Sequence, residues 1–176
     1  MEILAYIFDN LGLIGERTLE HIAIVAVAVG LAILTGVPLG IAITQNQKAA
    51  DIVLYVAAII ITIPSIALFG VMIPILSVIG QGIGYVPAVI AVLLYSQLPI
   101  IRNTYTAISN VDPALREAAK GLGMTPFQRL SQEELPLAIP VIMAGVRTAV
   151  VMNIGVAAIA AYIGAGGLGT FISRGI

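Results

Sequence analysis

The side chains of this chain that could do chemistry lie mostly in one polar segment, residues 102–136. This segment carries half of the eight Lys and Arg residues, namely Arg102, Arg116, Lys120 and Arg129. The chain has no cysteine, which excludes disulfides. It has a single histidine, His21, which argues against a metal site built from histidines. It also shows no Ser, His and acid set for nucleophilic catalysis. The sequence therefore predicts a segment that pairs with a partner in water, with no catalysis and no cofactor of its own.

The stretch Gly164-Ala-Gly166-Gly-Leu-Gly169 fits the spacing G-x-G-x-x-G, which in a dinucleotide-binding fold follows a strand and opens a helix. Here an apolar segment of membrane-span length precedes it, so we interpret it as an extracytoplasmic turn that is part of a gate. Gly164, Gly166 and Gly167 are the candidate gate residues. The chain contains no G-x-x-x-x-G-K-S/T motif and does not cradle ATP phosphates by that route.

Two short helices are expected within the polar segment. Asp112 is a good N-cap and Pro113 a good first helical residue, so a helix should run over 113–120. Gly121 and Gly123 then offer the positive φ that ends a helix. Thr125-Pro126-Phe127-Gln128 has the arrangement of a capping box and should open a second helix, which Leu135-Pro136 ends. The first helix is too short to be stable alone, so another surface must hold it: the bilayer, its own chain or a partner subunit.

These helices must sit between membrane spans. Residues 52–101 form a run of 50 residues without a charged side chain or a histidine. As one helix this run would be about 75 Å long, whereas a bilayer core is about 30 Å thick, so it holds at least two passes. Apolar residues make up 60 % of the chain and charged residues 10 %. Such a composition indicates an all-α, polytopic membrane bundle.

Four spans are expected, over residues 21–43, 52–78, 86–101 and 137–163, after an N-terminal tail of residues 1–18. Pro64 and Pro74 interrupt the second span. A break at Pro64 leaves a preceding helix too short to cross, so we interpret 52–78 as one kinked pass, with a re-entrant piece as the alternative. Excess Lys and Arg mark the cytoplasmic side. The loop 102–136 is then cytoplasmic, and the acidic tail is outside.

Arg147 is the only full charge well inside an expected span. Such a charge usually faces the interior of a bundle or water, so Arg147 is a candidate pathway residue. A guanidinium that snorkels to the boundary or binds a backbone carbonyl is the alternative. Asn153, six residues later, is a weaker candidate for the same region, and Pro64 is a third candidate because it breaks the second span.

The polar segment resembles the EAA loop of ABC importer permeases. Glu117-Ala118-Ala119, Gly123 three residues on, and Leu135-Pro136 match its spacing throughout. One position departs from the pattern, because Glu133 stands where an aliphatic residue is usual. The resemblance implies a type I transmembrane domain over residues 19–176 in which this loop is a coupling helix seated in a groove of a cytoplasmic ATPase. It also implies that Glu117, Ala118, Ala119, Gly123, Leu135 and Pro136 form the coupling site.

Similarity continues over Leu135–Ala149 and Ile163–Gly169 and points to the osmoprotectant branch, the permeases for glycine betaine, choline and carnitine. The implied partners are an ATPase dimer, a second permease chain that is identical or related, and an extracytoplasmic binding protein, in a bacterial or archaeal cytoplasmic membrane. Such permeases usually carry one more span after the glycine-rich segment. A permease for methionine or another small solute, an ATP-independent carrier or channel, and a membrane scaffold are the alternatives.

Overall fold

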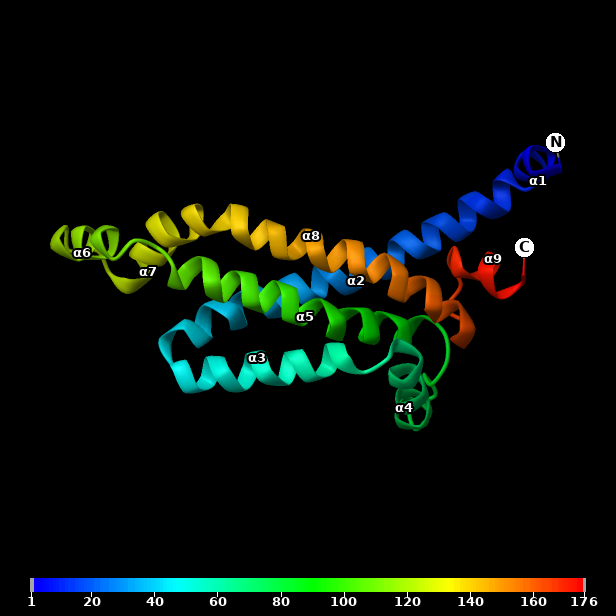
Figure 1. Cartoon of the computed structure of the whole chain (residues 1–176), viewed down its shortest axis with the longest axis horizontal. Helices are drawn as coiled ribbons and strands as arrows, with labels where there is room; N and C mark the ends of the chain where they lie inside the picture. Colours follow the sequence, from blue (N-terminus) through cyan, green and yellow to red (C-terminus); the bar gives the residue numbers. More distant parts are fainter. Residues whose placement is uncertain (1, 176) are drawn as a thin grey trace.

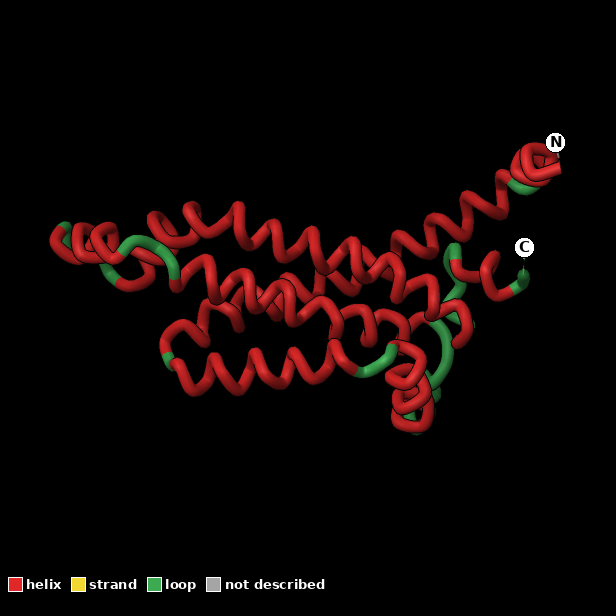
Figure 2. The backbone as a smooth tube through the Cα atoms, in the orientation of Figure 1, coloured by secondary structure: helices red, strands yellow, loops and turns green. Residues whose placement is uncertain are grey.

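The structure is a computed structural model that describes the backbone of residues 2–175 and the side chains of residues 6–175. All regular elements in this part of the chain are helical, which confirms the all-α prediction (Figure 2). The elements are α1 Glu2–Asp9, α2 Leu11–Ala42, a 3₁₀ turn Ile43–Gln45, α3 Gln47–Thr62, α4 Ser65–Ser77, α5 Tyr85–Ser109, α6 Pro113–Gly121, α7 Pro126–Arg129, a π-helical turn Leu130–Glu134, α8 Leu135–Ile159, a 3₁₀ turn Ala160–Ile163 and α9 Gly169–Ser173.

The three longest helices, α2, α5 and α8, form the body of the molecule. Helix α5 packs against both α2 and α8, and α3 lies against α5 on the side away from α8 (Figure 1). By length and composition, the described helices include three that could cross a membrane, 11–45, 85–109 and 126–163, or four if α3 and α4 form one bent span. The 3₁₀ turn after α2 lies at the same end of the bundle as α6 and α7. Both chain termini lie at the opposite end (Figure 1).

Glycines allow α2 and α8 to approach α5 closely. A Cβ placed on Gly40 of α2 would lie 2.7 Å from the Cβ of Thr104, and one on Gly36, a helical turn earlier, would lie 3.0 Å from Ile100 Cγ2. On α8, a Cβ on Gly145 would lie 2.6 Å from the carbonyl oxygen of Pro99. In lipid no hydrophobic force drives helices together, so membrane helices usually associate through small residues that allow close packing. The sequence therefore fixes where these three helices touch.

The kinked pass expected over 52–78 is two helices, α3 and α4, that meet at 100°. Pro64 has no N–H, and Ile63 before it has an extended backbone, so the helix stops at this point. The hydroxyl of Tyr95 on α5 donates to the carbonyl of Ile63 that the break leaves free. Pro74 does not interrupt the chain, because it lies inside α4. The bend is thus set by one proline and held by a side chain of the neighbouring helix.

The N-terminal part and α5 are longer helices than expected. Residues 2–9 form α1, and α2 begins at Leu11, ten residues before the expected span, with an ion pair of 2.8 Å between Arg17 and Glu20 on its surface. Helix α5 continues to Ser109 beyond the expected end at residue 101, so Arg102 belongs to α5 and not to the loop. Hydropathy identifies only the part of a helix that is embedded in lipid, and the helix itself can continue beyond the membrane boundary.

Candidate functional site

Both helix starts predicted in the polar segment are confirmed. The side chain of Asp112 accepts a hydrogen bond of 2.8 Å from the backbone N–H of Ala114, which caps α6. At α7 the capping box is complete: Thr125 Oγ1 accepts from the N–H of Gln128 at 3.3 Å, and Gln128 Oε1 accepts from the N–H of Thr125 at 2.8 Å. These bonds satisfy backbone donors that a helix start leaves free. Two short helices are thereby fixed in direction.

The turn between α6 and α7 needs a glycine at one position only. Gly123 has φ +75°, a conformation that L side chains rarely adopt. Gly121 is the last residue of α6 and does not have positive φ, so the expectation that both glycines supply it is wrong for Gly121. Gly123 alone lets the chain reverse from α6 into α7.

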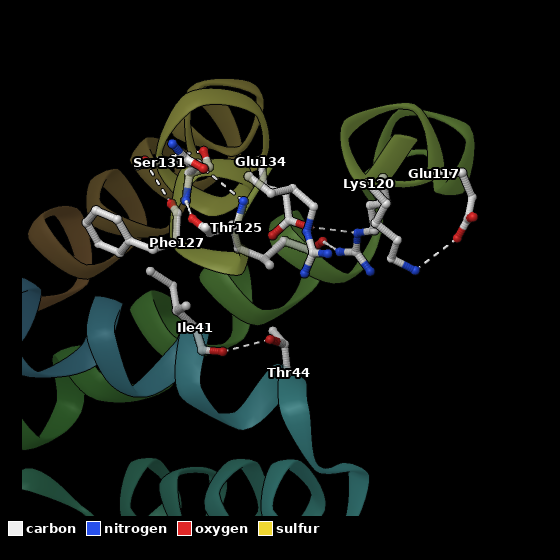
Figure 3. A network of polar contacts seen from close by, with 12 residues as sticks. Ile41, Thr44, Glu117, Lys120, Thr125, Phe127, Ser131 and Glu134 are labelled. Carbon is white, nitrogen blue, oxygen red and sulfur yellow. Dashed lines mark hydrogen bonds and ion pairs between the residues drawn. The ribbon is translucent and has the colours of Figure 1, made fainter. Parts of the chain in front are cut away.

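A buried carboxylate that sequence reasoning missed joins the two short helices to the bundle. Glu134, 5 % exposed, lies 3.0 Å from Arg116 Nε of α6 and accepts a hydrogen bond of 3.1 Å from Arg129 Nε of α7 (Figure 3). Arg116 also donates to the carbonyl of Ile108 near the end of α5. We call these three side chains, Arg116, Arg129 and Glu134, the Glu134 clamp. It ties α5, α6, α7 and the start of α8 into one unit.

The helix does not end at Leu135-Pro136, contrary to the sequence prediction. The N–H of Leu135 donates to the carbonyl of Leu130, five residues back, in the π-helical turn Leu130–Glu134. This wider turn comes directly before Pro136, whose ring would otherwise collide with the carbonyl four residues earlier. The chain therefore runs helically from Pro126 to Ile163. Leu135 packs against Ala107, Ile108 and their neighbours at the end of α5.

Helices α6 and α7 expose both charged and apolar side chains. Glu117 is exposed and pairs with Lys120 at 3.0 Å, and Ala118 is exposed beside it. Ala119 is buried against its own chain, so of the two alanines expected to admit a partner only Ala118 faces outward. Leu122 and Phe127 are 82 % and 77 % exposed. Exposed apolar side chains of this size mark a binding surface where they gather into one patch.

The two glycine turns at the other end of the bundle lie together. The N–H of Gly84 donates to the carbonyl of Ile163 at 2.8 Å, which joins the turn before α5 to the turn after α8. Gly164, Gly166 and Gly167 all have positive φ. The three candidate gate glycines thus form one loop next to the turn before α5, and no strand precedes the loop among the described residues.

Helix α2 holds this loop by side chains that the sequence analysis did not select. Glu20 accepts a hydrogen bond of 2.8 Å from the N–H of Gly167. His21 is buried, and its Nε2 donates to the carbonyl of Ile154 on α8 at 3.1 Å. A Cβ at Gly166 would lie closer to Glu20 Oε2 than van der Waals contact allows, and one at Gly167 would lie 3.0 Å from His21 Nδ1, so a side chain at either position requires these two residues to shift. The only signal in the sequence was a carboxylate and a histidine at the edge of an apolar run.

The three candidate pathway residues do not come together. Arg147 is exposed on α8 and has no partner among the described residues. Asn153 is fully buried and donates to Ser96 Oγ of α5 at 2.8 Å. Six residues on a helix correspond to about 240° of rotation beyond one full turn, so the expectation that the two share a region is wrong. Pro64 lies at the α3–α4 bend and is exposed.

Comparison with known proteins agrees with this architecture. Residues 22–176 match the family described as binding-protein-dependent transport system inner membrane component. The chain is 57 % identical to the osmoprotectant import permease protein OsmW of Salmonella typhimurium, covering all of this chain and 82 % of that protein. It is 45 % identical to the choline transport system permease protein OpuBB of Bacillus subtilis, covering 99 % of this chain and 78 % of that protein.

Among solved structures, the chain is similar to inward-facing conformations of the MetNI methionine ABC transporter. One of these has a TM-score of 0.81 and 26 % identity, and the alignment covers 92 % of this chain and 79 % of that chain. A second crystal form gives a TM-score of 0.78. The helical bundle, the capped helices between α5 and α8 and these similarities lead to one conclusion: the chain belongs to the family of binding-protein-dependent transport system inner membrane components, the permease subunits of ABC importers.

Proposed function

We propose that this chain is the translocation subunit of an importer for compatible solutes such as glycine betaine, choline or carnitine, and that α6 and α7 are its contact with the ATPase. The chain itself catalyses nothing, and ATP hydrolysis belongs to a separate subunit. The observation that carries the proposal is the unit of α6 and α7, which exposes Glu117 and Leu122 while the Glu134 clamp ties it to two long helices. In this proposal the unit faces the cytoplasm and the N-terminus faces outside.

The clamp explains how movement of an ATPase could reach the membrane. A force on α6 passes through Arg116 to the end of α5 and through Glu134 to the start of α8. Both contacts are made by charged groups, which form the stronger hydrogen bonds. Movement of the ATPase groove on ATP binding therefore tilts α5 and α8 together and opens the path outward. Hydrolysis of ATP then returns the helices to their starting position. A flexible loop would absorb the same displacement instead of transmitting it.

The pathway requires more than one copy. The exposed face of α8 holds Arg147, and a charge that faces lipid in mid-membrane costs about 2.5–3.5 kcal/mol on insertion scales. A second permease chain, identical or related, would cover this face and enclose water beside it. We place Arg147 on that path. Gly30 of α2 and Gly155 of α8, where an added Cβ would meet nothing within 4 Å, suit close contact between such chains.

The solute is assigned from the relatives. The proteins of Salmonella typhimurium and Bacillus subtilis are named for osmoprotectant and choline transport, and both exceed 40 % identity along nearly the whole chain. Methionine is the second candidate, since the similar solved structures belong to a methionine transporter. Aromatic cages bind quaternary ammonium groups best, and Tyr55, Tyr85 and Tyr162 are exposed and far apart in the sequence, so high affinity belongs to the binding protein.

The experiment uses cells that express the transporter with its ATPase and binding protein. Glu117→Ala and Gly123→Val should each abolish uptake of labelled choline and glycine betaine and the co-purification of the ATPase, while the chain still inserts in the membrane. Gly121→Ala is the matched control, because a Cβ there meets nothing within 4 Å and its φ is ordinary. Normal uptake in both test variants contradicts the coupling assignment. Uptake of methionine alone contradicts the assigned solute.

A further inference from the structure

A second polar site lies behind the coupling unit, on the side turned toward the bundle. It is a cavity of about 300 Å³ between the 3₁₀ turn after α2, the end of α5 and the Glu134 clamp. This volume is at the lower end of the range for small-molecule sites. Its wall includes Thr44, Gln45, Tyr105, Ser109, Arg116 and Arg129. None of the outward-facing coupling residues Glu117, Ala118 and Leu122 belongs to it.

The cavity has an excess positive charge. Arg116 and Arg129 both line it, and the only acid on its wall is Glu134, so the charged side chains sum to +1. One oxygen, Glu134 Oε1, serves both guanidinium groups, at 3.0 and 3.1 Å. A guanidinium has five N–H donors, and each of these two side chains uses only one or two of them within the described residues. Several charged donors of these two lining residues therefore have no acceptor among the described residues.

The neutral groups on the wall do not use these donors. Tyr105 donates to Gln47 Oε1 at 3.0 Å, and Thr44 Oγ1 donates to the carbonyl of Ile41 at 2.7 Å. Ser109 is exposed and its hydroxyl makes no hydrogen bond among the described residues. The cavity thus offers two half-buried guanidinium groups and a free hydroxyl, a donor set that suits an oxyanion and not a cation.

We propose that this cavity binds a phosphate-type oxyanion, held by Arg116 and Arg129 with Ser109 as an additional donor. Guanidinium groups recognise phosphate oxygens with paired N–H bonds, and such contacts are among the strongest hydrogen bonds in proteins. The anion is the phosphate of a lipid headgroup or free phosphate from solution. Either would neutralise the excess charge beside the Glu134 clamp. The proposal does not depend on the solute or on the ATPase contact.

The test uses this chain purified in dodecyl maltoside, a detergent without phosphate. One arm titrates inorganic phosphate at constant ionic strength by calorimetry. The other arm counts phosphatidylglycerol molecules that remain bound, by native mass spectrometry. The variant is Ser109→Asp, which adds a negative charge to the wall without touching the clamp, and the control is Ser109→Asn, of equal size and no charge. A unit charge about 4 Å away is worth about 1 kcal/mol even in water, so anion affinity should fall about fivefold or more in Ser109→Asp only.

A second pair of variants tests the arginines. Arg129→Gln should lower binding in whichever arm detects it, whereas Arg174→Gln, an equal change of charge at the other end of the bundle, should leave it as in the wild type. Binding of phosphate in solution identifies a free anion, and retained phosphatidylglycerol alone identifies the headgroup. The proposal is overturned if neither anion binds, or if Ser109→Asp and Ser109→Asn bind equally.

Discussion

The carboxylate of Glu20 on α2 accepts a hydrogen bond from the backbone N–H of Gly167, 147 residues later, at 2.8 Å. The same carboxylate pairs with Arg17 at 2.8 Å. The glycine loop after α8 is therefore fastened to the first long helix, and opening the loop requires breaking this bond. If the loop is part of a gate, Glu20 is its latch.

The first prediction concerns this latch. Glu20→Ala removes the acceptor of Gly167, which should loosen residues 164–169 and lower the free energy of unfolding by about 1–2 kcal/mol, since a hydrogen bond to a partly exposed charged group contributes about that much. Hydrogen exchange at Gly167 should become faster. Glu16→Ala, one turn earlier, is the control, because Glu16 is exposed and makes no hydrogen bond or ion pair among the described residues. Unchanged exchange at Gly167 in Glu20→Ala would rule out the latch.

The second prediction concerns the contact between α5 and α8. A Cβ on Gly145 would lie 2.6 Å from Pro99 O and 2.7 Å from Asn103 Cβ, so Gly145→Ala forces the helices apart. Overpacking of this kind costs about 1–3 kcal/mol. The thermal midpoint in detergent should fall. Gly155→Ala on the same helix meets nothing within 4 Å and should keep or slightly raise the midpoint. Equal midpoints for the two variants would show that the helices do not pack this closely.

The sequence predicted well those features that depend on short stretches of chain. The charge-free run 52–101 predicted membrane helices, and Asp112 and Thr125 predicted two helix starts, because hydropathy and capping are local properties. The EAA spacing was enough to identify the family that the comparisons confirm. Helix ends were less accurate, as for α2 and α5, because a helix continues past the lipid boundary when its side chains find partners in water.

Several features that the sequence could not predict depend on residues far apart in the chain. The 100° bend at Pro64 is held by Tyr95, whose hydroxyl binds the carbonyl of Ile63, 32 residues earlier in the chain. The role of Glu134 could not be predicted, because its partner Arg116 lies 18 residues earlier. The two side chains meet only because the turn at Gly123 and the π-helical turn bring α6 back to the start of α8. Glu20 needs Gly167 beside it. Local sequence patterns do not indicate which charged side chains will pair across the fold.

The third prediction tests the Glu134 clamp. Glu134→Gln leaves Arg116 and Arg129 without their shared carboxylate, which should cost about 2 kcal/mol of local stability. Helices α6 and α7 should then move independently of α5 and α8. ATPase activity should lose its stimulation by the loaded binding protein, even where the ATPase still co-purifies. Glu133→Gln is the control, because Glu133 makes no ion pair among the described residues. Full stimulation in Glu134→Gln would show that coupling bypasses the clamp.

The fourth prediction concerns Arg147, and the absence of cysteine makes it direct to test. A single cysteine introduced at residue 147 can be labelled with no background from this chain. If Arg147 faces a water-filled path, Arg147→Cys should react with a charged, membrane-impermeant thiol reagent in the assembled transporter, and the rate should change when ATP binds. Ala149→Cys, fully buried two residues away, should stay unreactive.

A different pattern of labelling would place the residue elsewhere. If Arg147→Cys reacted only with a lipid-soluble maleimide, the side chain would face lipid and the native guanidinium would reach the boundary by snorkelling. Protection from both reagents in the complex, with reactivity in the isolated chain, would place residue 147 in the contact between permease chains. Arg147→Gln adds a functional readout, because loss of a pathway charge should lower the maximal rate of uptake while the ATPase still binds. Arg147→Lys keeps the positive charge and should therefore retain part of the maximal uptake rate that Arg147→Gln loses.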